Sequence, residues 1–289
     1  TRAQLEVGAL VDELAGDRVG LVVFAGRAFA ACPLTTDAAA LRLFLRGAGP
    51  EVVVLFGIGI AFTFNEPVTW YEFVLDASTE ARSLGLYTVL NTNGYIMPEP
   101  AKELFRHTDA MNVDIKAFDE DVYRSTCGGS LRPVLDACLL ARSMGVHVEL
   151  TYLLVPGVND SPDEVSRFSE WVVDSMGEDT PLFFLRFRPF HRLAHLPEQT
   201  LERMHEAATI ASRAGVRYVY FGGVADIGRD TRCPACSAVV IERKGAESTG
   251  KVCFRGGEVS RFCPSVSDVR VNLSEGRCPS CGERIPVVL

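Results

Sequence analysis

The stretch LRPVLDACLLARSMGVHVELTYLLVPGVND, residues 131–160, sets the fold class of this chain. Apolar residues recur at helical spacing from residue 131 to residue 144, and Gly145 provides a helix stop. The alternating run over residues 146–154 then predicts a strand, which the turn residues of PGVND end. A helix that leads through a tight turn into a strand is the repeating unit of a parallel sheet.

The same helix–strand unit recurs on both sides of this stretch. Strict alternation of helices and strands favours a parallel sheet that is either open or closed into a barrel. We therefore predict an α/β fold, a partial (β/α) barrel with parallel strands, followed by a small β module. The other predicted helices are 70–83, 100–107, 161–176 and 198–214. The other predicted strands are 86–90, 110–115, 182–188 and 217–221, and residues 51–64 form one or two strands more.

Composition and charge exclude several classes of function. The chain has 289 residues, with 37 acidic against 29 basic side chains and a formal net charge of −8. This balance repels polyanions, so we expect no nucleic acid partner. The longest apolar run, residues 52–64, is too short to cross a membrane. Because the sequence shows no secretory signal, we expect a cytoplasmic protein with no membrane partner.

Two paired-cysteine motifs lie near the end of the chain, Cys233-Pro-Ala-Cys236 and Cys278-Pro-Ser-Cys281. In each motif a tight turn directs two thiolates at one point, and two such turns form the closed tetrahedral sulfur set of a structural zinc site. Such a site lets a module fold that is too small for a core of its own. Iron bound by the same ligands is the alternative.

Two glycine-containing segments match nucleotide-binding motifs only in part. Residues 245–251 match the start of a phosphate-binding loop, but Val252 stands where a Ser or Thr would hold magnesium. Residues 57–59 lack the third glycine of a dinucleotide fingerprint. We interpret the first segment as a turn between strands and the second as strand. Cys253 and Cys263 lie between the paired motifs, and we interpret them as bystanders.

Polar motifs follow the predicted strands one after another. They are Asn65-Glu66-Pro67, Thr92-Asn93-Gly94, Asn112-Val113-Asp114-Ile115-Lys116 and Pro156-Gly157-Val158-Asn159-Asp160. The carboxyl ends of parallel strands converge on one rim, where α/β barrels hold their ligands. A solvated loop is the alternative for each motif alone, so the series carries more weight than any one member.

Residues from about 59 onward resemble the radical S-adenosylmethionine (SAM) enzyme of the AmmeMemoRadiSam system, a relative of glycyl-radical-enzyme activating enzymes. The resemblance rests on GIAFTFNEPVTWYEFVLDA, GLYTVLNTNGYI, DAMNVDIKAFDEDVYRSTCG, HVELTYLLVPGVNDS, RYVYFGG and the two CPxC motifs. It implies a partial barrel of radical SAM type and the reductive cleavage of SAM to a 5′-deoxyadenosyl radical by a [4Fe–4S] cluster. The resemblance leaves the substrate open, whether a small molecule or a protein.

The resemblance also implies which residues contact SAM. Residues 65–67 would receive the amino group, Asp114 and Lys116 would lie near the ribose and the carboxylate, and the strand that leads into Pro156 would flank the adenine. The full set is Asn65, Glu66, Pro67, Asn91, Asn93, Asp114, Lys116, Pro156, Gly157 and His191. SAM is zwitterionic, so a set of carboxylates, a cation and backbone groups suits it.

One part of the family pattern is absent from the sequence. Members of the family hold the cluster with Cys-x-x-x-Cys-x-x-Cys after the first barrel strand, because iron–sulfur clusters need thiolate ligands. Before Cys127 this chain has only Cys32. We therefore expect little or no radical chemistry from this chain. The alternative function is a non-catalytic protein that binds SAM or a partner and keeps a structural zinc ribbon.

Residues 1–48 resemble a fragment of a von Willebrand factor A domain, on the residues GDRVGLVVFAGRAFAACPLTTDAAALRLFL. Of that family's magnesium ligands only a threonine, Thr35 or Thr36, has a counterpart here. One hydroxyl does not hold a hard dication, so a cap for a helix over residues 37–45 is the better interpretation. A metal-dependent adhesion module is accordingly the weakest functional hypothesis.

The two resemblances predict three regions: a von Willebrand factor A-like fragment at 1–57, a radical SAM-like partial barrel at 58–225 and a zinc-ribbon-like module at 226–289. We expect residues 18–26 to replace the missing first barrel strand and to pair with the strand that ends at Asn65. The helix over residues 37–45 would then be the crossover. The join near residues 48–58 is either a natural fusion or an artefact of gene assembly.

Overall fold

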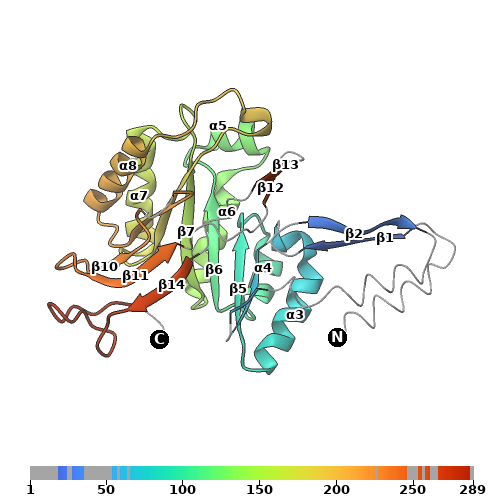
Figure 1. Cartoon of the computed structure of the whole chain (residues 1–289), viewed down its shortest axis with the longest axis horizontal. Coiled ribbons are helices and arrows are strands. Elements are labelled where there is room, and N and C mark those ends of the chain that lie inside the picture. Colours follow the sequence, from blue (N-terminus) through green and yellow to red (C-terminus); the bar gives the residue numbers. More distant parts are fainter. Residues whose placement is uncertain are drawn as a thin grey trace. The chain divides into compact units, whose positions relative to one another are not determined.

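The computed structural model describes residues 19–24, 28–35, 54–56, 59–63, 66–224, 227–245, 253–255, 258–260 and 266–286 (Figure 1). The chain divides into two compact units. The first consists of residues 1–92 and 102–111, and the second consists of residues 93–101 and 112–289.

A seven-stranded sheet with the strand order β3-β4-β5-β6-β7-β8-β9 dominates the fold. Its strands are β3 (Val54–Phe56), β4 (Gly59–Phe62), β5 (Tyr87–Thr92), β6 (Ala110–Ile115), β7 (His147–Leu154), β8 (Leu182–Arg186) and β9 (Val219–Gly222). The six strands β4 to β9 form the parallel sheet, and β3 pairs with β4 in the antiparallel sense. Spatial order equals sequence order, which confirms the predicted α/β fold with parallel strands.

Helices connect the strands where the periodicity predicts them. The longer ones are α3 (Tyr71–Ser83), α4 (Pro98–Phe105), α6 (Leu131–Ser143), α7 (Pro162–Trp171) and α8 (Leu201–Ala214). Short turns of helix are η2 (Pro67–Trp70), α5 (Glu120–Val122), η3 (Tyr123–Cys127), η4 (Val172–Met176) and η5 (His191–Leu193). Ser161 caps α7 through its hydroxyl, and Pro162 follows at the start of the helix. No helix in the described part of the chain is long and apolar enough to span a bilayer.

The core of the second unit lies between β7 and the helices that cover it. Leu150, Tyr152 and Leu154 are fully buried and alternate with half-buried residues along β7. Phe168 of α7 stacks on Tyr152 with ring centroids 4.6 Å apart. Cys138 of α6 is also fully buried and belongs to this core. Each such large side chain contributes about 1.5–3 kcal/mol by its removal from water.

The first described strands contradict one prediction. β1 (Val19–Phe24) pairs antiparallel with β2 (Ala28–Thr35) in a two-stranded sheet of their own, so β1 does not extend the parallel sheet. The expectation that residues 18–26 replace the first barrel strand is therefore wrong. Two β-rich runs separated by a short Gly-containing segment favour a hairpin, because local pairing costs less chain entropy than a crossover. Asn65, Thr36 and the predicted helix over residues 37–45 lie outside the described residues.

The C-terminal β module has the short strands predicted for it. β10 (Thr231–Arg232), β11 (Val239–Gly245) and β14 (Val266–Val271) form one antiparallel sheet, and β12 (Cys253–Arg255) pairs with β13 (Glu258–Ser260). Figure 1 shows β10, β11 and β14 side by side. Of the segment resembling a phosphate-binding loop, only Gly245 lies within the described residues, at the end of β11.

The module shares its core with the last strand of the parallel sheet. Tyr218 and Tyr220 at β9 pack in one apolar cluster with Cys233, Cys278 and Ile285 of the module. The backbone N–H of Phe221 donates to the carbonyl oxygen of Gly228 at 2.8 Å, so the chain that enters the module runs along β9. The module therefore buries Cys233 and Cys278 against the last strand of the sheet, whereas Cys236 and Cys281 are exposed.

Candidate functional site

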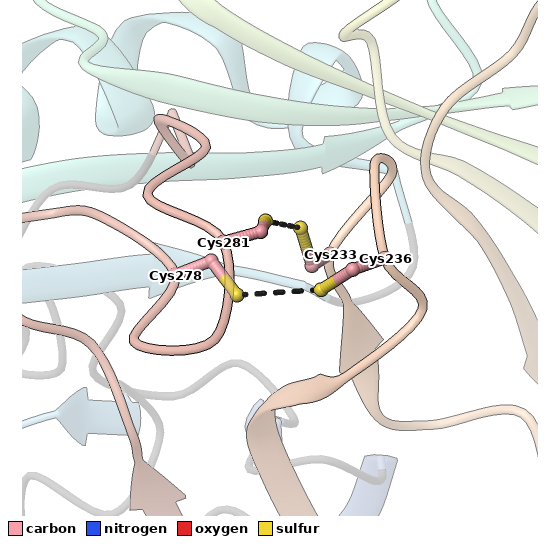
Figure 2. Close-up of side chains that lie close together, drawn as sticks. All are labelled: Cys233, Cys236, Cys278 and Cys281. Atoms are coloured by element: carbon pink, nitrogen blue, oxygen red, sulfur yellow. Dashed lines mark hydrogen bonds between the residues drawn. The ribbon is translucent and has the colours of Figure 1, made fainter.

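The four cysteines of the paired motifs converge on one point (Figure 2). Their sulfur atoms all lie within 4.8 Å of one another. The Sγ atoms of Cys233 and Cys281 are 3.5 Å apart, and those of Cys236 and Cys278 are 3.7 Å apart. Figure 2 shows that the four side chains come from two loops that face each other. In the described part of the chain this is the one group of three or more Cys, His, Asp or Glu that could hold a metal ion.

The two cysteine loops have the same backbone hydrogen bonds. The N–H of Ser237 donates to the carbonyl oxygen of Cys233, and the N–H of Gly282 donates to that of Cys278, both at 2.8 Å. The residue after the second cysteine is left-handed in both loops, with φ of 61° at Ser237 and 79° at Gly282. Equivalent turns thus present the two cysteine pairs to each other in the same way.

Backbone N–H groups point at the sulfur atoms. Burial acts to raise the pKa of Cys278, but N–H donation from Ser280 and Cys281, together with hydrogen bonds from the thiols of Cys236 and Cys233, lowers it to about 7. The N–H of Glu283 acts to lower the pKa of Cys281, but the neighbouring thiols raise it to about 12. Four thiolates at this spacing need a cation among them. The set can hold a metal ion in a closed tetrahedral geometry, which leaves no position for a substrate.

Glu283 also ties the second cysteine loop to the barrel. Its carbonyl oxygen accepts from the N–H of Cys278 at 2.8 Å, and its carboxylate pairs with Arg217 just before β9 at 2.5 Å. Arg217 pairs with Asp179 as well, at 3.0 Å. Cys253 lies in β12, and Cys263 lies outside the described residues, so their interpretation as bystanders stays a prediction.

In the first unit, Glu66 is the strand-end residue with the clearest contacts. Its carboxylate accepts from the N–H of Val68 at 3.2 Å and from the hydroxyl of Thr92 at 2.5 Å. The first contact caps η2, whose first residue is the buried Pro67. Glu66 therefore joins the end of β5 to the segment after β4. Asn91, also on the predicted list, is an exposed residue within β5.

In the second unit, Asp114 and Lys116 form an ion pair at the end of β6. Lys116 Nζ lies 2.7 Å from Asp114 Oδ2, and about a third of each side chain is exposed (37% and 33%). A half-buried carboxylate and ammonium side by side suit a zwitterionic ligand. Asn93 accepts from the N–H of Tyr95 at 2.8 Å and so shapes the turn after β5.

The remaining predicted residues lie on the loops after β7 and β8. Pro156 and Gly157 form the turn after β7, where the N–H of Gly157 donates to Asp160 Oδ1 at 2.8 Å. His191 begins η5, is exposed, and has the left-handed φ of 50° that is uncommon outside glycine. The loop after β7 also contacts the backbone of Lys116, because Asn159 Nδ2 donates to its carbonyl oxygen at 2.6 Å.

Sequence reasoning missed a buried carboxylate at these strand ends. Glu164 is 5% exposed, and its Oε1 accepts from the N–H of Phe118 and from the hydroxyl of Tyr152, both at 2.7 Å. Ser161 and Glu164 match the spacing of a capping box. That motif sends the Glu side chain back to the helix start, whereas here it reaches the loop after β6. The capping-box spacing therefore predicts a local contact for Glu164, but its side chain contacts the loop after β6.

The described cysteines outside the C-terminal module do not fit an iron–sulfur cluster. Cys32 lies in β2 of the separate hairpin, and Cys138 is buried in α6. Cys127 ends η3, and burial raises its pKa although Lys116 acts against this. A cluster needs three or four thiolates at one point. Only the four cysteines of the module meet at one point in the described residues, and they form a set of their own.

Comparison with known proteins places these features in a family. The profile of the Radical SAM superfamily matches residues 54–169. An uncharacterized protein of Methanocaldococcus jannaschii is 37% identical over 246 residues, which cover 83% of this chain and 68% of that protein. Pyruvate formate-lyase 1-activating enzyme of Escherichia coli is 29% identical over 139 residues, which cover 47% of this chain and 55% of the enzyme. The chain thus spans about half the length of that enzyme.

One solved structure shows the same fold. The crystal structure of a domain of pyruvate-formate lyase-activating enzyme from Bacteroides vulgatus matches with a TM-score of 0.50 and 20% sequence identity. The match covers 58% of this chain and 100% of that domain. At this identity the likeness concerns the fold.

Proposed function

The chain belongs to the radical SAM superfamily, and we propose that it is a relative of the AmmeMemoRadiSam enzyme that keeps the SAM-facing residues but lacks the cluster ligands. The superfamily implies SAM and a [4Fe–4S] cluster, which together generate a 5′-deoxyadenosyl radical. The observation that carries the proposal is the Asp114–Lys116 ion pair at the end of β6, since it offers both charges to a zwitterion.

In this proposal SAM binds along the strand ends. Lys116 and Asp114 contact the carboxylate and ribose, and Glu66 with the backbone around Pro67 receives the amino group. The turn at Pro156 and Gly157 flanks the adenine. Asn65, Asn91, Asn93 and His191 complete the proposed set. Calorimetric titration of SAM tests the assignment: Lys116→Ala should weaken binding about tenfold, the size of one charge-assisted contact. Unchanged affinity in this variant contradicts it.

We further propose that this chain generates no radical. Cys32 is the only cysteine before Cys127, so no Cys-x-x-x-Cys-x-x-Cys motif precedes the matched region. Anaerobic iron–sulfur reconstitution, followed by absorption and electron paramagnetic resonance spectra, tests this. We expect no stoichiometric [4Fe–4S] signal once the four module cysteines are replaced by serine. A cluster that survives this replacement overturns the proposal.

A non-catalytic SAM- or partner-binding protein is the second candidate, and the missing cluster ligands favour it. The measurement that tests it is turnover: SAM that binds and stays intact under a strong reductant supports the binding protein. Released 5′-deoxyadenosine contradicts the binding protein and the proposed absence of radical chemistry alike. The substrate or partner would be a small molecule or a protein in the cytoplasm. The net charge of −8 disfavours nucleic acid.

We propose zinc as the metal of the four-cysteine set. Cys233, Cys236, Cys278 and Cys281 offer four sulfur donors and no open position, which is the pattern of structural zinc. Elemental analysis of protein purified without added metal tests it, with one zinc per chain expected. If the analysis finds one iron per chain, with the absorption of a mononuclear Fe–thiolate centre, the metal is iron and the zinc assignment is wrong.

The division at residues 57/58 and 225/226 stays part of the proposal, with a von Willebrand factor A-like fragment before the barrel and a zinc ribbon after it. The β1–β2 hairpin lies in that fragment and does not belong to the parallel sheet, which supports a foreign origin. The genomic DNA across residues 48–58 tests the join. A continuous reading frame in the genome supports a natural fusion, and a break there supports an assembly artefact.

A further inference from the structure

A buried polar network lies at the carboxyl ends of β6, β7 and β8, behind the proposed SAM contacts. Its centre is Asn159, which is 1% exposed. Asn159 Nδ2 donates to the carbonyl oxygens of Lys116 at 2.6 Å and Leu153 at 2.7 Å. Its Oδ1 accepts from the N–H of Val155 at 2.7 Å. One amide side chain therefore joins the end of β6 to the end of β7.

Tyr152 and Glu164 reinforce the same junction. The Tyr152 hydroxyl lies 2.7 Å from Glu164 Oε1 and 3.0 Å from the carbonyl oxygen of Asn159. Burial first, and then the charge of Glu164, raise the pKa of Tyr152, so its hydroxyl stays a donor. Glu164 Oε1 also accepts from the N–H of Phe118, two residues beyond Lys116. Lys116 and Phe118, in the loop after β6, are thus both anchored to buried side chains.

Gln199 extends the network to β8. It is 2% exposed, and its Nε2 donates to Asp160 Oδ2 at 2.9 Å. The backbone carbonyl oxygen of Gln199 accepts from Nε of Arg186, the last residue of β8, at 2.7 Å. Asp160 Oδ1 in turn accepts from the N–H of Gly157. The turn at Gly157 is therefore held from the β8 side as well as by Asn159.

We propose that Asn159 is a positioning residue that holds Lys116 and the turn at Pro156–Gly157 at a fixed separation. The inference rests on the proposed function, in which these residues contact SAM. All three hydrogen bonds of the Asn159 side chain go to backbone that flanks those contacts. Loops that are ordered before the ligand arrives lose less entropy on binding, so a buried amide that orders them raises affinity.

The experiment compares three variants. Asn159→Ala removes all three hydrogen bonds. Asn159→Asp keeps the acceptor for Val155 but turns the donor into an oxygen that faces two carbonyl oxygens. The matched control is Thr180→Ala, because Thr180 is 8% exposed and donates one buried hydrogen bond, to the carbonyl oxygen of Met176 at 2.8 Å, before the amino end of β8.

Hydrogen exchange measures how well the backbone of these loops is ordered, and it needs no ligand. In Asn159→Ala we expect faster exchange at the amides of residues 116–118, 153–155, 157 and 158, with α8 protected as in the parent protein. Thr180→Ala should leave those amides unchanged. SAM titration is the second measurement, with an affinity about tenfold weaker in Asn159→Ala and unchanged in Thr180→Ala. Asn159→Asp should regain part of the protection and affinity toward pH 5, because a protonated carboxyl again donates one hydrogen bond.

Parent-like exchange at residues 116–118 in Asn159→Ala contradicts the proposal. Faster exchange throughout the second unit also contradicts it, since Asn159 would then stabilise the fold in general. A parent protein that does not bind SAM refutes the proposed function, and the exchange pattern still decides whether Asn159 orders these loops.

Discussion

The four-cysteine module and the loops after β6 and β7 organise their polar groups in opposite ways. In the module the four cysteine side chains point toward one another and form a complete set of metal ligands. At the strand ends the Asp114–Lys116 pair is partly exposed, while Asn159 and Glu164 behind it are buried. A closed set satisfies its ion and excludes a substrate. A buried support leaves the groups in front of it accessible, so we propose that the first region serves stability and the second serves binding.

The largest effect should come from the closed set. Cys278→Ser removes a ligand that is also part of the core shared with Tyr218 and Tyr220. We expect metal content to fall from about one ion per chain to near zero and the module to lose more than about 5 kcal/mol of stability. Elemental analysis and thermal unfolding measure both. Cys127→Ser is the control, because Cys127 is exposed and outside the cysteine set. Full metal content in Cys278→Ser would mean that Cys253 or Cys263 is a ligand.

The buried support should give the next largest effect. Tyr152→Phe leaves the buried Glu164 carboxylate with one donor fewer, which costs about 2 kcal/mol. Urea unfolding followed by fluorescence measures it. Tyr95→Phe is the matched control, since Tyr95 is exposed and its hydroxyl lies 3.5 Å from Ser130. Equal stabilities of the two variants would contradict the prediction that the buried network contributes more stability than an exposed tyrosine.

A smaller effect concerns the contact between module and barrel. A double-mutant cycle of Arg217→Ala and Glu283→Ala should give a coupling energy of about 0.5–1 kcal/mol, because the pair is only partly shielded from water. The coupling should be smaller in 1 M salt than in 10 mM salt, because the Debye length in 1 M salt is about one tenth as long. Coupling that is independent of salt would show that the two variants disturb the cysteine turn itself.

The smallest effect tests the likeness of the two cysteine loops. Ser237→Gly should stabilise the module by about 0.5 kcal/mol, since glycine adopts the left-handed conformation that serine adopts there at a cost. Gly282→Ser should destabilise it by a similar amount. Chemical unfolding of the metal-loaded protein measures both. Opposite signs support equivalent turns, and a loss in Ser237→Gly contradicts them.

Signals that lie close together in the sequence predicted most of this fold. Gly145 follows the end of α6, Ser161 caps α7, and the paired cysteines meet as their spacing predicts. The β1–β2 hairpin differs from the crossover that we predict for residues 1–48, although Gly26 between two β-rich runs is a hairpin signal.

The support of the strand-end site was beyond prediction from the sequence. Asn159 meets Lys116 across 43 positions, and Glu164 meets Phe118 across 46. An asparagine after a strand is typical of any turn, so only the packed structure distinguishes a buried amide from a solvated one. Which residues contact SAM stays a prediction, which the titration of Lys116→Ala tests.

The shared core of β9 and the module has a consequence for the life of the protein in a crowded cell. β9 is the last strand of an open sheet, and the chain at Gly228 occupies part of its outer edge. An uncovered edge strand is a template for pairing with other chains, which leads to aggregates. Loss of metal would loosen this cover along with the cysteine loops. We therefore expect metal supply to govern how long the protein stays dispersed after synthesis, whatever the strand-end site binds.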